Sequence, residues 1–362
     1  MDHKGRQKRL RSALESTRLE ALLVTHLPNI RYLCGFTGSA ATLLITPAKS
    51  LFFTDGRYTE QARTEVQGSR VVIARKSPIV AAAEWLVSQG RKRRPQTIGI
   101  EGDDLTVAER ARLAKSLGPG FRLREAPPLV EKARVLKDED EISLLRAAVI
   151  LGASLFDYAL EAIRPGVKET EVAAEMEYAA RRAGADGMSF ETIIASGLRS
   201  ALPHGRASGA VIPAQGFVVC DFGVILAGYC SDMTRTVHVG QPSDEARRMY
   251  DAVREAQQAA VDAVRPGAGV SEVDSAARKL LQKQGLGRYF THSTGHGVGL
   301  EIHESPRLAV GQADVLRPGM VVTIEPGVYL PGTGGVRIED MVVVTESGCM
   351  VLTPTTKELI TI

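Results

Sequence analysis

The sequence from His292 to Glu304 reads HSTGHGVGLEIHE and holds three of the chain's seven histidines, with three glycines between the first histidine and the last. A His-x-x-x-His spacing can place two rings on one face of a zinc-binding helix. Each glycine, however, costs about 1 kcal/mol in a helix interior relative to alanine. The glycines favour a strand or tight loop close to a ligand or another backbone. If His296 binds a metal, its partner ligands come from elsewhere; three hydrogen-bonded histidines without a metal are the alternative.

The composition is that of an ordinary globular protein. The chain has 362 residues, 44% of them hydrophobic and 24% charged, and a formal net charge of +3. This length suits two domains, and these fractions exclude a disordered or fibrous chain. The small net charge gives no general case for binding nucleic acid or a membrane. The dense basic run Arg91 to Arg94 precedes Pro95 and is interpreted as a solvated loop.

The four cysteines are scattered without a Cys-x-x-Cys pair, as is usual in a reducing compartment. The N-terminal residues carry charge throughout and contain no apolar segment of signal-peptide length. No apolar run approaches the roughly 18 residues of a membrane span. These features together predict a soluble cytoplasmic protein.

The first third of the chain alternates strand and helix patterns. Apolar runs predict strands at residues 22–25, 42–46, 51–54, 71–74 and 98–101. Amphipathic patterns predict helices at residues 57–66, 79–89 and 106–117. We therefore expect an α/β domain that ends after Pro127-Pro128, with a first domain over residues 1–130 and a second over residues 131–362.

The second domain contains an internal echo. RPGVKETEV begins at Arg164 and RPGAGVSEV begins at Arg265, an offset of 265 − 164 = 101 residues. Each copy lies between two helical patterns, residues 139–163 and 169–183 for the first copy and 244–264 and 271–284 for the second. The echo predicts a duplicated helix-helix-strand unit with a pseudo-twofold axis; a chance match is the alternative.

The echo continues in two β-rich segments. Residues 216–224 read GFVVCDFGV and residues 320–328 read MVVTIEPGV, which aligns Asp221 with Glu325. Each segment then turns through a glycine-containing loop and returns with a second carboxylate, Asp232 in one copy and Glu339 in the other.

Ionised carboxylates in apolar strands are costly unless they are paired or bind a metal. If the pseudo-twofold axis brings the two copies together, these four carboxylates converge with His296 beside them, and two divalent cations balance their charge. Oxygen ligands with one imidazole favour Mn²⁺, with Co²⁺, Fe²⁺ or Zn²⁺ as alternatives. Two such metals suit metal-assisted hydrolysis. For each carboxylate alone, an exposed strand residue or a surface ion pair is the alternative.

Three segments, GHGVGLEIHE, TIEPG and GVRIED, resemble the pita-bread metallopeptidases, which include Xaa-Pro dipeptidase (prolidase), aminopeptidase P and methionine aminopeptidase. The resemblance extends from about Glu131 to the C-terminus. NIRYLCGFTGS and TDGRYTEQA resemble the N-terminal domain of the proline-directed members, which argues against methionine aminopeptidase. Creatinase has two similar domains but lacks the metal ligands. The implied fold is an α/β N-terminal domain followed by an α+β pita-bread catalytic domain with an internal pseudo-twofold repeat.

The resemblance also implies roles for individual residues. The metal ligands it implies are Asp221, Asp232, His296, Glu325 and Glu339. Glu325 further resembles the group that takes the proton from the attacking hydroxide. His204 and His303 resemble the histidines that bind substrate and stabilise the oxyanion, and His292 resembles a further active-site histidine. Arg337 resembles an arginine that helps to orient the site, and we group it with Arg307 as a substrate-binding residue.

The implied activity is hydrolysis of the Xaa-Pro bond at a free N-terminus. That bond is a tertiary amide without an N–H, so proteases that grip the chain through strand-like hydrogen bonds lose a donor there. Arg307 lies where some prolidases carry an arginine, and it favours an Xaa-Pro dipeptidase slightly, because a dipeptidase needs a cation for the carboxylate that follows proline; a surface residue without this role is the alternative for Arg307. Aminopeptidase P acting on longer peptides, and a non-catalytic pita-bread binding module, are the alternatives. The family also implies a homodimer.

Overall fold

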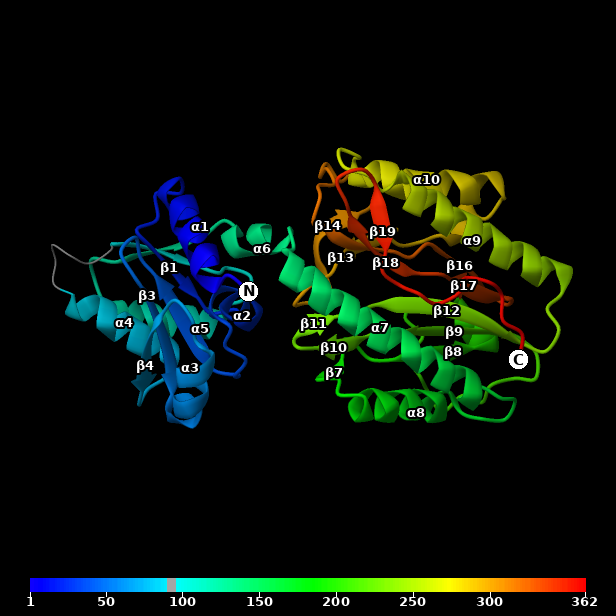
Figure 1. The fold of residues 1–362 in the computed structure, drawn as a ribbon, viewed down its shortest axis with the longest axis horizontal. Coiled ribbons are helices and arrows are strands. Elements are labelled where there is room, and N and C mark those ends of the chain that lie inside the picture. Colours follow the sequence, from blue (N-terminus) through cyan, green and yellow to red (C-terminus); the bar gives the residue numbers. More distant parts are fainter. Residues whose placement is uncertain (90–95) are drawn as a thin grey trace. The chain divides into compact units, whose positions relative to one another are not determined.

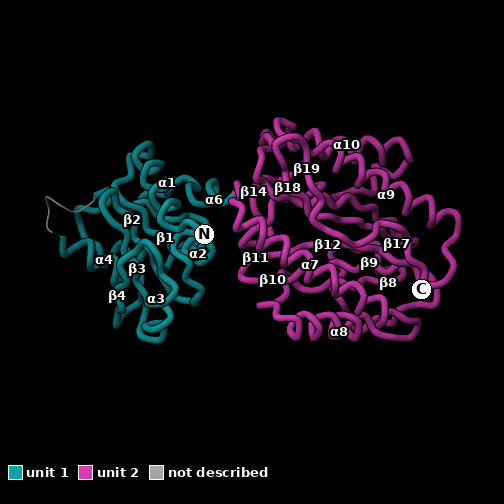
Figure 2. The backbone as a smooth tube through the Cα atoms, in the orientation of Figure 1, with its two compact units in different colours: residues 1–134 teal, residues 135–362 magenta. Residues whose placement is uncertain are grey.

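The computed structural model describes residues 1–89 and 96–362, and Figure 1 shows the fold. The basic run Arg91 to Arg94 lies outside the described residues. The chain divides into two compact units, Met1–Arg134 and Val135–Ile362 (Figure 2).

The first unit contains a six-stranded sheet in the order β4-β3-β2-β1-β5-β6. Its strands are β1 (Ala21–Val24), β2 (Ala41–Ile45), β3 (Ser50–Asp55), β4 (Arg70–Ala74), β5 (Thr97–Ile100) and β6 (Arg122–Glu125). Its helices are α1 (His3–Glu15), α2 (Leu27–Cys34), α3 (Thr59–Glu65), α4 (Pro78–Ser88), α5 (Val107–Leu117) and α6 (Leu129–Arg134). Strand β2 pairs antiparallel with β1 and β3, and the other pairs are parallel. The predicted α/β class is confirmed.

Helix α1 was not predicted from the sequence, because part of its buried face is polar. Arg6 and Gln7 are buried beside Leu10 and Leu14. Nη1 of Arg6 donates to the carbonyl of Tyr32 at 3.1 Å, and Nε2 of Gln7 donates to the carbonyl of Leu33 at 3.0 Å. These bonds satisfy donors that would otherwise be costly to bury.

Four helices of the second unit begin and end within one residue of their predicted bounds. They are α7 (Glu139–Ala162), α8 (Glu169–Arg182), α9 (Asp244–Ala263) and α10 (Val270–Lys283). The predicted cap at Asp138 is present, since its Oδ1 accepts from the Glu141 N–H at 3.0 Å and Glu141 Oε2 accepts from the Asp138 N–H at 3.1 Å. In Figure 1 the pair α9–α10 (yellow) and helix α8 (green) lie at opposite edges of this unit, with strands between them.

The strands of the second unit form a five-stranded sheet, two three-stranded sheets and a two-stranded sheet. Their orders are β14-β13-β15-β18-β19, β12-β9-β8, β11-β10-β7 and β16-β17. Their bounds are β7 (Gly187–Met188), β8 (Ile193–Ser196), β9 (Gly216–Phe222), β10 (Val224–Leu226), β11 (Tyr229–Cys230), β12 (Met233–Val239), β13 (Gly295–Gly297), β14 (Glu304–Leu308), β15 (Val321–Ile324), β16 (Gly327–Leu330), β17 (Gly334–Arg337), β18 (Asp340–Val344) and β19 (Cys349–Val351). The segment His292 to Glu304 contains β13 and no helix, so its glycines were interpreted correctly.

The duplicated unit is present. The pairs β9–β12 and β15–β18 are both antiparallel, and each connection includes a short two-stranded ribbon, β10–β11 in one copy and β16–β17 in the other. The two copies meet where the Glu339 N–H donates to the carbonyl of Thr234 at 3.1 Å. Two hydrogen bonds between Thr236 and Arg337 continue this contact. The end of β12 that follows Asp232 therefore lies beside Glu339.

Helix α7 is long and apolar enough to cross a membrane by length and composition alone, and it is the one such helix among the described residues. Leu145, Val149, Leu155 and Phe156 on this helix are buried in hydrophobic clusters of the second unit. A core helix passes the same test, and α7 packs as one. The four cysteines are free thiols, and three of them are buried.

Candidate metal centre and active site

Four carboxylates lie at or next to the ends of paired strands. Asp221 lies in β9, Asp232 directly precedes β12, Glu325 follows β15 and Glu339 directly precedes β18. Asp221 is 9% exposed and Glu339 only 2%. Asp221 pairs with Thr234 in the sheet, so these two side chains share a face. Because side chains alternate between the faces of a strand, Asp232, two residues before Thr234, belongs to the same face.

His296 joins these carboxylates from β13. Its Nε2 lies 3.6 Å from Oδ2 of Asp232 and 3.5 Å from Oε1 of Glu325. In the described part of the chain, the ligand atoms of Asp232, His296 and Glu339 all lie within 4.8 Å of one another, close enough to hold one metal ion. The five residues expected to bind metal line a single cavity.

The tautomer of His296 follows from its neighbours. Nδ1 lies 3.0 Å from the carbonyl oxygen of Gly297. Because a carbonyl oxygen only accepts hydrogen bonds, Nδ1 carries the proton and Nε2 presents its lone pair to the carboxylate cluster. Burial lowers the pKa of this ring, which favours the neutral form that a metal requires. Metal-binding histidines are commonly oriented by such a bond on the other nitrogen.

Asp221 carries a buried acceptor atom. Its Oδ2 accepts from Nη2 of Arg337 at 2.5 Å. Its Oδ1 is buried and has no hydrogen-bond partner within residues 1–89 and 96–362. A buried carboxylate oxygen without a donor is costly, and a cation at this point would satisfy it. Together with the oxygen-rich donor set and one imidazole, this atom fits a site for divalent metal ions.

Burial and repulsion between neighbouring carboxylates raise the pKa of three carboxyl groups in the site. Burial is the largest cause of a raised pKa at Asp232 and Glu339, and neighbouring carboxylates add to the shift. Burial raises the pKa of Glu325 to about 7. The protonated forms of Asp232, Glu325 and Glu339 are therefore favoured unless cations compensate the charge.

A chain of hydrogen bonds runs from His292 to the cluster. Nδ1 of His292 donates to the carbonyl of Ser293 at 2.8 Å, so Nε2, 2.9 Å from Oη of Tyr329, accepts from that hydroxyl. The Tyr329 oxygen in turn accepts from Nη1 of Arg337 at 2.6 Å. Tyr329 was missed because an aromatic residue in an apolar strand carries no charge to draw attention to it.

Arg337 is buried and connects several parts of the site. Besides Asp221 and Tyr329, its guanidinium donates to Oγ1 of Thr234 at 3.1 Å and to the carbonyl of Pro203 at 3.1 Å. The last bond fixes the loop that carries His204. These contacts describe an orienting role; the grouping of Arg337 with substrate-binding residues stays a prediction.

The cavity has a volume of about 740 Å³. Besides the five expected ligands, its lining includes His204, His292, His303, Arg307 and Arg337. Apolar side chains form another part of the wall, namely Phe190, Ile193, Pro203 and Ile302. The His303 ring meets the His296 ring edge to face, with centroids 4.5 Å apart. Every residue singled out from the sequence thus borders this one cavity.

Two arginines lie at the cavity with different partners. Nη1 of Arg206 lies 2.5 Å from Oε2 of Glu191. Arg307 is exposed and pairs with His296 in the register between β13 and β14. In the described part of the chain its guanidinium has no hydrogen bond or ion pair. The Arg307 charge is therefore available to an anionic ligand, whereas Arg206 is already neutralised.

Residues 143–346 match metallopeptidase family M24, and residues 6–136 match the creatinase/prolidase N-terminal domain. The chain belongs to metallopeptidase family M24. This M24 protein is 37% identical to the Xaa-Pro dipeptidase of Pyrococcus horikoshii over 98% of each chain. Its fold matches the Xaa-Pro dipeptidase from Bacillus anthracis with a TM-score of 0.95 at 42% identity, covering 99% of this chain and 100% of the other. The X-Pro aminopeptidase from Thermotoga maritima matches with a TM-score of 0.90 at 35% identity and the same coverage.

Proposed function

We propose that this M24 protein is a dinuclear metal-dependent Xaa-Pro dipeptidase that hydrolyses the bond between an N-terminal residue and proline. The observation that carries the proposal is that the five expected metal ligands line one cavity, where Asp232, His296 and Glu339 bring ligand atoms within 4.8 Å of one another. The same cavity is lined by Arg307, whose guanidinium has no ion pair among the described residues. Similarity to proteins named Xaa-Pro dipeptidase over nearly the whole chain supports the same activity.

The residues that would hold two divalent metal ions are Asp221, Asp232, His296, Glu325 and Glu339. Mn²⁺ suits four carboxylates and one imidazole, and Co²⁺, Zn²⁺ and Fe²⁺ are compatible with the same donors. When bound, the metals lower the pKa of water and polarise a carbonyl oxygen. Two such cations would balance the negative charge of the four carboxylates, including Oδ1 of Asp221, which has no hydrogen-bond partner among the described residues.

Glu325 is the residue suited to take a proton from the attacking water. Its carboxyl lines the cavity beside His296, with Oε1 3.5 Å from Nε2 of that ring, and a carboxylate at this place can accept the proton of a nearby water. Thr323 donates to its Oε1 at 3.3 Å and limits its rotation.

We assign to His204 and His303 the stabilisation of the oxyanion that would form on the scissile carbonyl. Both rings line the cavity and are exposed to it rather than packed in the core. Proximity to His296 and His204 adds to burial in lowering the pKa of His303. A preorganised donor at this position typically contributes about 10²–10³-fold to the rate.

The cavity wall explains the preference for proline. Phe190, Ile193 and Ile302 provide apolar surface for the pyrrolidine ring. Arg307 can bind the carboxylate that directly follows proline in a dipeptide. In a longer peptide that position is a neutral amide, so the bound carboxylate would favour dipeptides.

Aminopeptidase P activity on longer peptides is the second candidate, because the fold matches an X-Pro aminopeptidase closely as well. Hydrolysis of Gly-Pro, Gly-Ala and Gly-Pro-Gly-Gly by the Mn²⁺-loaded protein separates the candidates. A dipeptidase cleaves Gly-Pro far faster than the other two, and aminopeptidase P prefers the tetrapeptide. Comparable rates for Gly-Ala and Gly-Pro would contradict proline specificity, and absence of both bound metal and hydrolysis would indicate a binding module.

We further propose that the protein works as a homodimer in the cytoplasm. The cysteine usage of the chain supports a reducing compartment. Closed twofold dimers are the commonest soluble oligomers. Light scattering of the purified chain tests the dimer, and a mass of one chain, 38.9 kDa, would contradict it.

A further inference from the structure

Arg235 lies directly behind the metal centre. It follows Thr234 in β12, and neighbouring side chains in a strand point to opposite faces. Thr234 faces the site, where its Oγ1 donates to Oε2 of Glu339 at 2.7 Å. Arg235 is on the other face and is only 2% exposed. A fully buried guanidinium is costly unless its donors are satisfied, so its partners define its role.

All five N–H donors of Arg235 have acceptors. Nη1 donates to the carbonyls of Thr234 at 2.9 Å and Glu339 at 2.5 Å. Nη2 donates to Oδ1 of Asp340 at 2.7 Å and to the carbonyl of Thr355 at 2.7 Å. Nε donates to the carbonyl of Thr356 at 2.8 Å. One side chain thus joins β12, the start of β18 and the C-terminal segment, defined here as residues 353–358.

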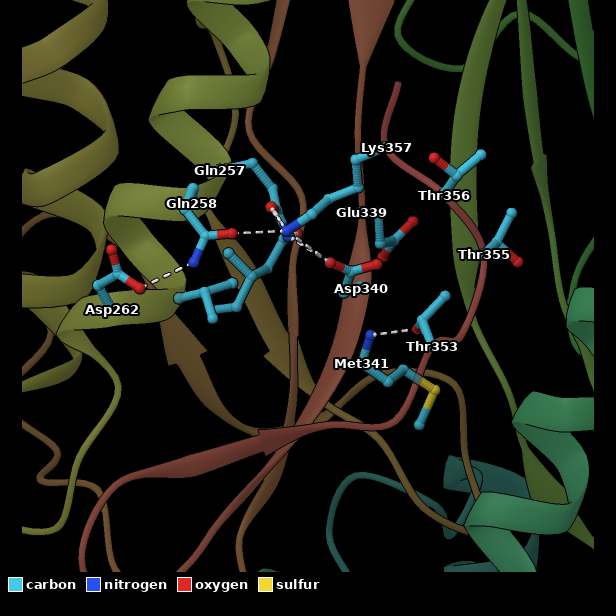
Figure 3. A network of polar contacts seen from close by, with 12 residues as sticks. Gln257, Gln258, Asp262, Glu339, Asp340, Met341, Thr353, Thr355, Thr356 and Lys357 are labelled. Carbon is cyan, nitrogen blue, oxygen red and sulfur yellow. Dashed lines mark hydrogen bonds and ion pairs between the residues drawn. The ribbon is translucent and has the colours of Figure 1, made fainter. Parts of the chain in front are cut away.

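Asp340 extends this network away from the site. It directly follows Glu339 and is 1% exposed. Its Oδ2 accepts from Nε2 of Gln257 at 2.8 Å and lies 3.4 Å from Nζ of Lys357. Figure 3 shows Lys357 reaching from the C-terminal segment to Asp340 and the glutamines of α9, with Glu339 beside them. Nζ of Lys357 donates to Gln257 at 2.9 Å and to Gln258 at 2.8 Å.

The backbone of Glu339 is therefore held on two sides. Its N–H donates to the carbonyl of Thr234, and its carbonyl accepts from Arg235, which binds the same Thr234 carbonyl. With both peptide groups held by these hydrogen bonds, the Glu339 carboxylate can move only by rotation about its side-chain bonds. Groups that orient metal-binding residues in this way commonly change metal affinity about 10–100-fold when they are mutated.

We propose that Arg235 is a positioning residue that couples metal binding at Glu339 to the docking of the C-terminal segment. A Glu339 backbone that suits metal binding also positions the carbonyl that accepts from Arg235. The Arg235 guanidinium in turn binds the carbonyls of Thr355 and Thr356 in the C-terminal segment. By linkage, docking of the C-terminal segment strengthens metal binding by the same factor. The inference rests on the proposed metal site and is independent of the substrate.

Calorimetric titration of the metal-free full-length chain with Mn²⁺ tests this coupling. We expect Arg235→Met to weaken Mn²⁺ binding about 10–100-fold, and Arg235→Lys to recover only part of the loss because lysine offers three donors in place of five. Leu281→Ala in α10 is the matched control, since it removes buried core volume and its apolar side chain makes no hydrogen bond to the network. It should lower the melting temperature and leave metal affinity unchanged.

Hydrogen exchange gives a second readout that needs no mutation. Mn²⁺ should slow amide exchange in residues 353–358 of the unaltered chain, and Asp340→Asn should reduce that protection. Either an unchanged Mn²⁺ affinity in folded Arg235→Met, or equal exchange of this segment with and without Mn²⁺, would overturn the coupling. If Arg235→Met does not fold, Asp340→Asn and the exchange experiment decide. A chain that binds Mn²⁺ with this coupling but does not cleave Gly-Pro would refute the proposed function alone.

Discussion

Tyr329 accepts a hydrogen bond from Arg337, with 2.6 Å between Oη and Nη1. The same hydroxyl donates to His292, and the same guanidinium binds Asp221. The neutral Tyr329 side chain therefore connects a histidine of the substrate cavity with a carboxylate of the metal centre. Burial raises the pKa of Tyr329 to about 12, so the hydroxyl keeps its proton at neutral pH.

Replacing Tyr329 with phenylalanine removes this connection and little else. Hydrogen bonds to charged groups are worth about 1.5–3 kcal/mol, so we expect kcat/KM for Gly-Pro to fall about 10–100-fold. The metals would still have all five ligands, and Mn²⁺ affinity should stay within about 3-fold. Steady-state kinetics and calorimetry measure the two effects. A loss of metal affinity as large as the loss of kcat/KM would contradict a role confined to His292 and Arg337.

His303→Ala removes a side chain that borders the cavity beside His296. We expect kcat for Gly-Pro to fall about 10²–10³-fold with a much smaller change in KM, because an oxyanion donor acts mainly in the transition state. The metal content of the variant, measured by elemental analysis, should equal that of the unaltered protein. A rise in KM at unchanged kcat would instead assign His303 to ground-state binding.

Arg307→Ala tests the recognition of the dipeptide carboxylate. We expect KM for Gly-Pro to rise about 10–100-fold, since an ion pair with the carboxylate is lost. Hydrolysis of Gly-Pro-NH₂, which lacks the carboxylate, should change little. Arg206→Ala is the control, because that guanidinium is already paired with Glu191. An equal rise in KM for Gly-Pro in Arg307→Ala and Arg206→Ala would contradict a specific role of Arg307 in binding the dipeptide carboxylate.

The perturbed carboxyls predict how stability depends on pH. The folded-state pKa of Glu325 is about 7, above its ordinary value of 4.5, so its stabilising contribution is complete below about pH 4.5 and is lost as the pH rises through 7. Asp232 and Glu339 shift in the same direction. His292, with a pKa lowered to about 4, destabilises the fold only below about pH 6.5.

The melting temperature of the metal-free protein should therefore fall as the pH rises from about 6.5, above which His292 no longer opposes the change, through the Glu325 pKa of about 7. Glu325→Gln should flatten this fall because it cannot ionise. Mn²⁺ binds ionised carboxylates, so the increase in melting temperature that it causes should grow over the same range. Calorimetric scans with and without Mn²⁺ measure both trends. A metal-free protein whose melting temperature rises over this range would contradict the raised pKa values.

The fold was predictable where local pattern and cap chemistry agreed. Helix α7 has an N-terminal capping box, and its apolar residues recur at helical spacing, so its bounds were predicted within one residue. Strand β6 was missed because its residues, Arg122 to Glu125, are mostly charged and exposed, so pairing with β5 rather than an apolar pattern makes it a strand. Helix α2 was missed because its eight residues give little room for a periodic pattern.

The site was predictable where a charge stands in an apolar strand. That argument singled out Asp221 and Glu325, and it applies equally to Arg235, which the sequence analysis passed over. Tyr329 offers no such signal, because its contacts with His292 and Arg337 arise only when β16 folds against β17 and the segment after α10. The internal echo predicted the convergence of the two copies, but the hydrogen bonds between Thr234 and Glu339 through which the copies meet carry no sequence signal.

The most direct test of the account is a titration of the metal-free protein with Mn²⁺ while the initial rate of Gly-Pro hydrolysis is measured. We predict no hydrolysis without metal and a rate that rises to a plateau at about two equivalents per chain, as expected of a dinuclear site. Hydrolysis of Gly-Pro at an undiminished rate in the metal-free, chelator-treated protein would contradict it.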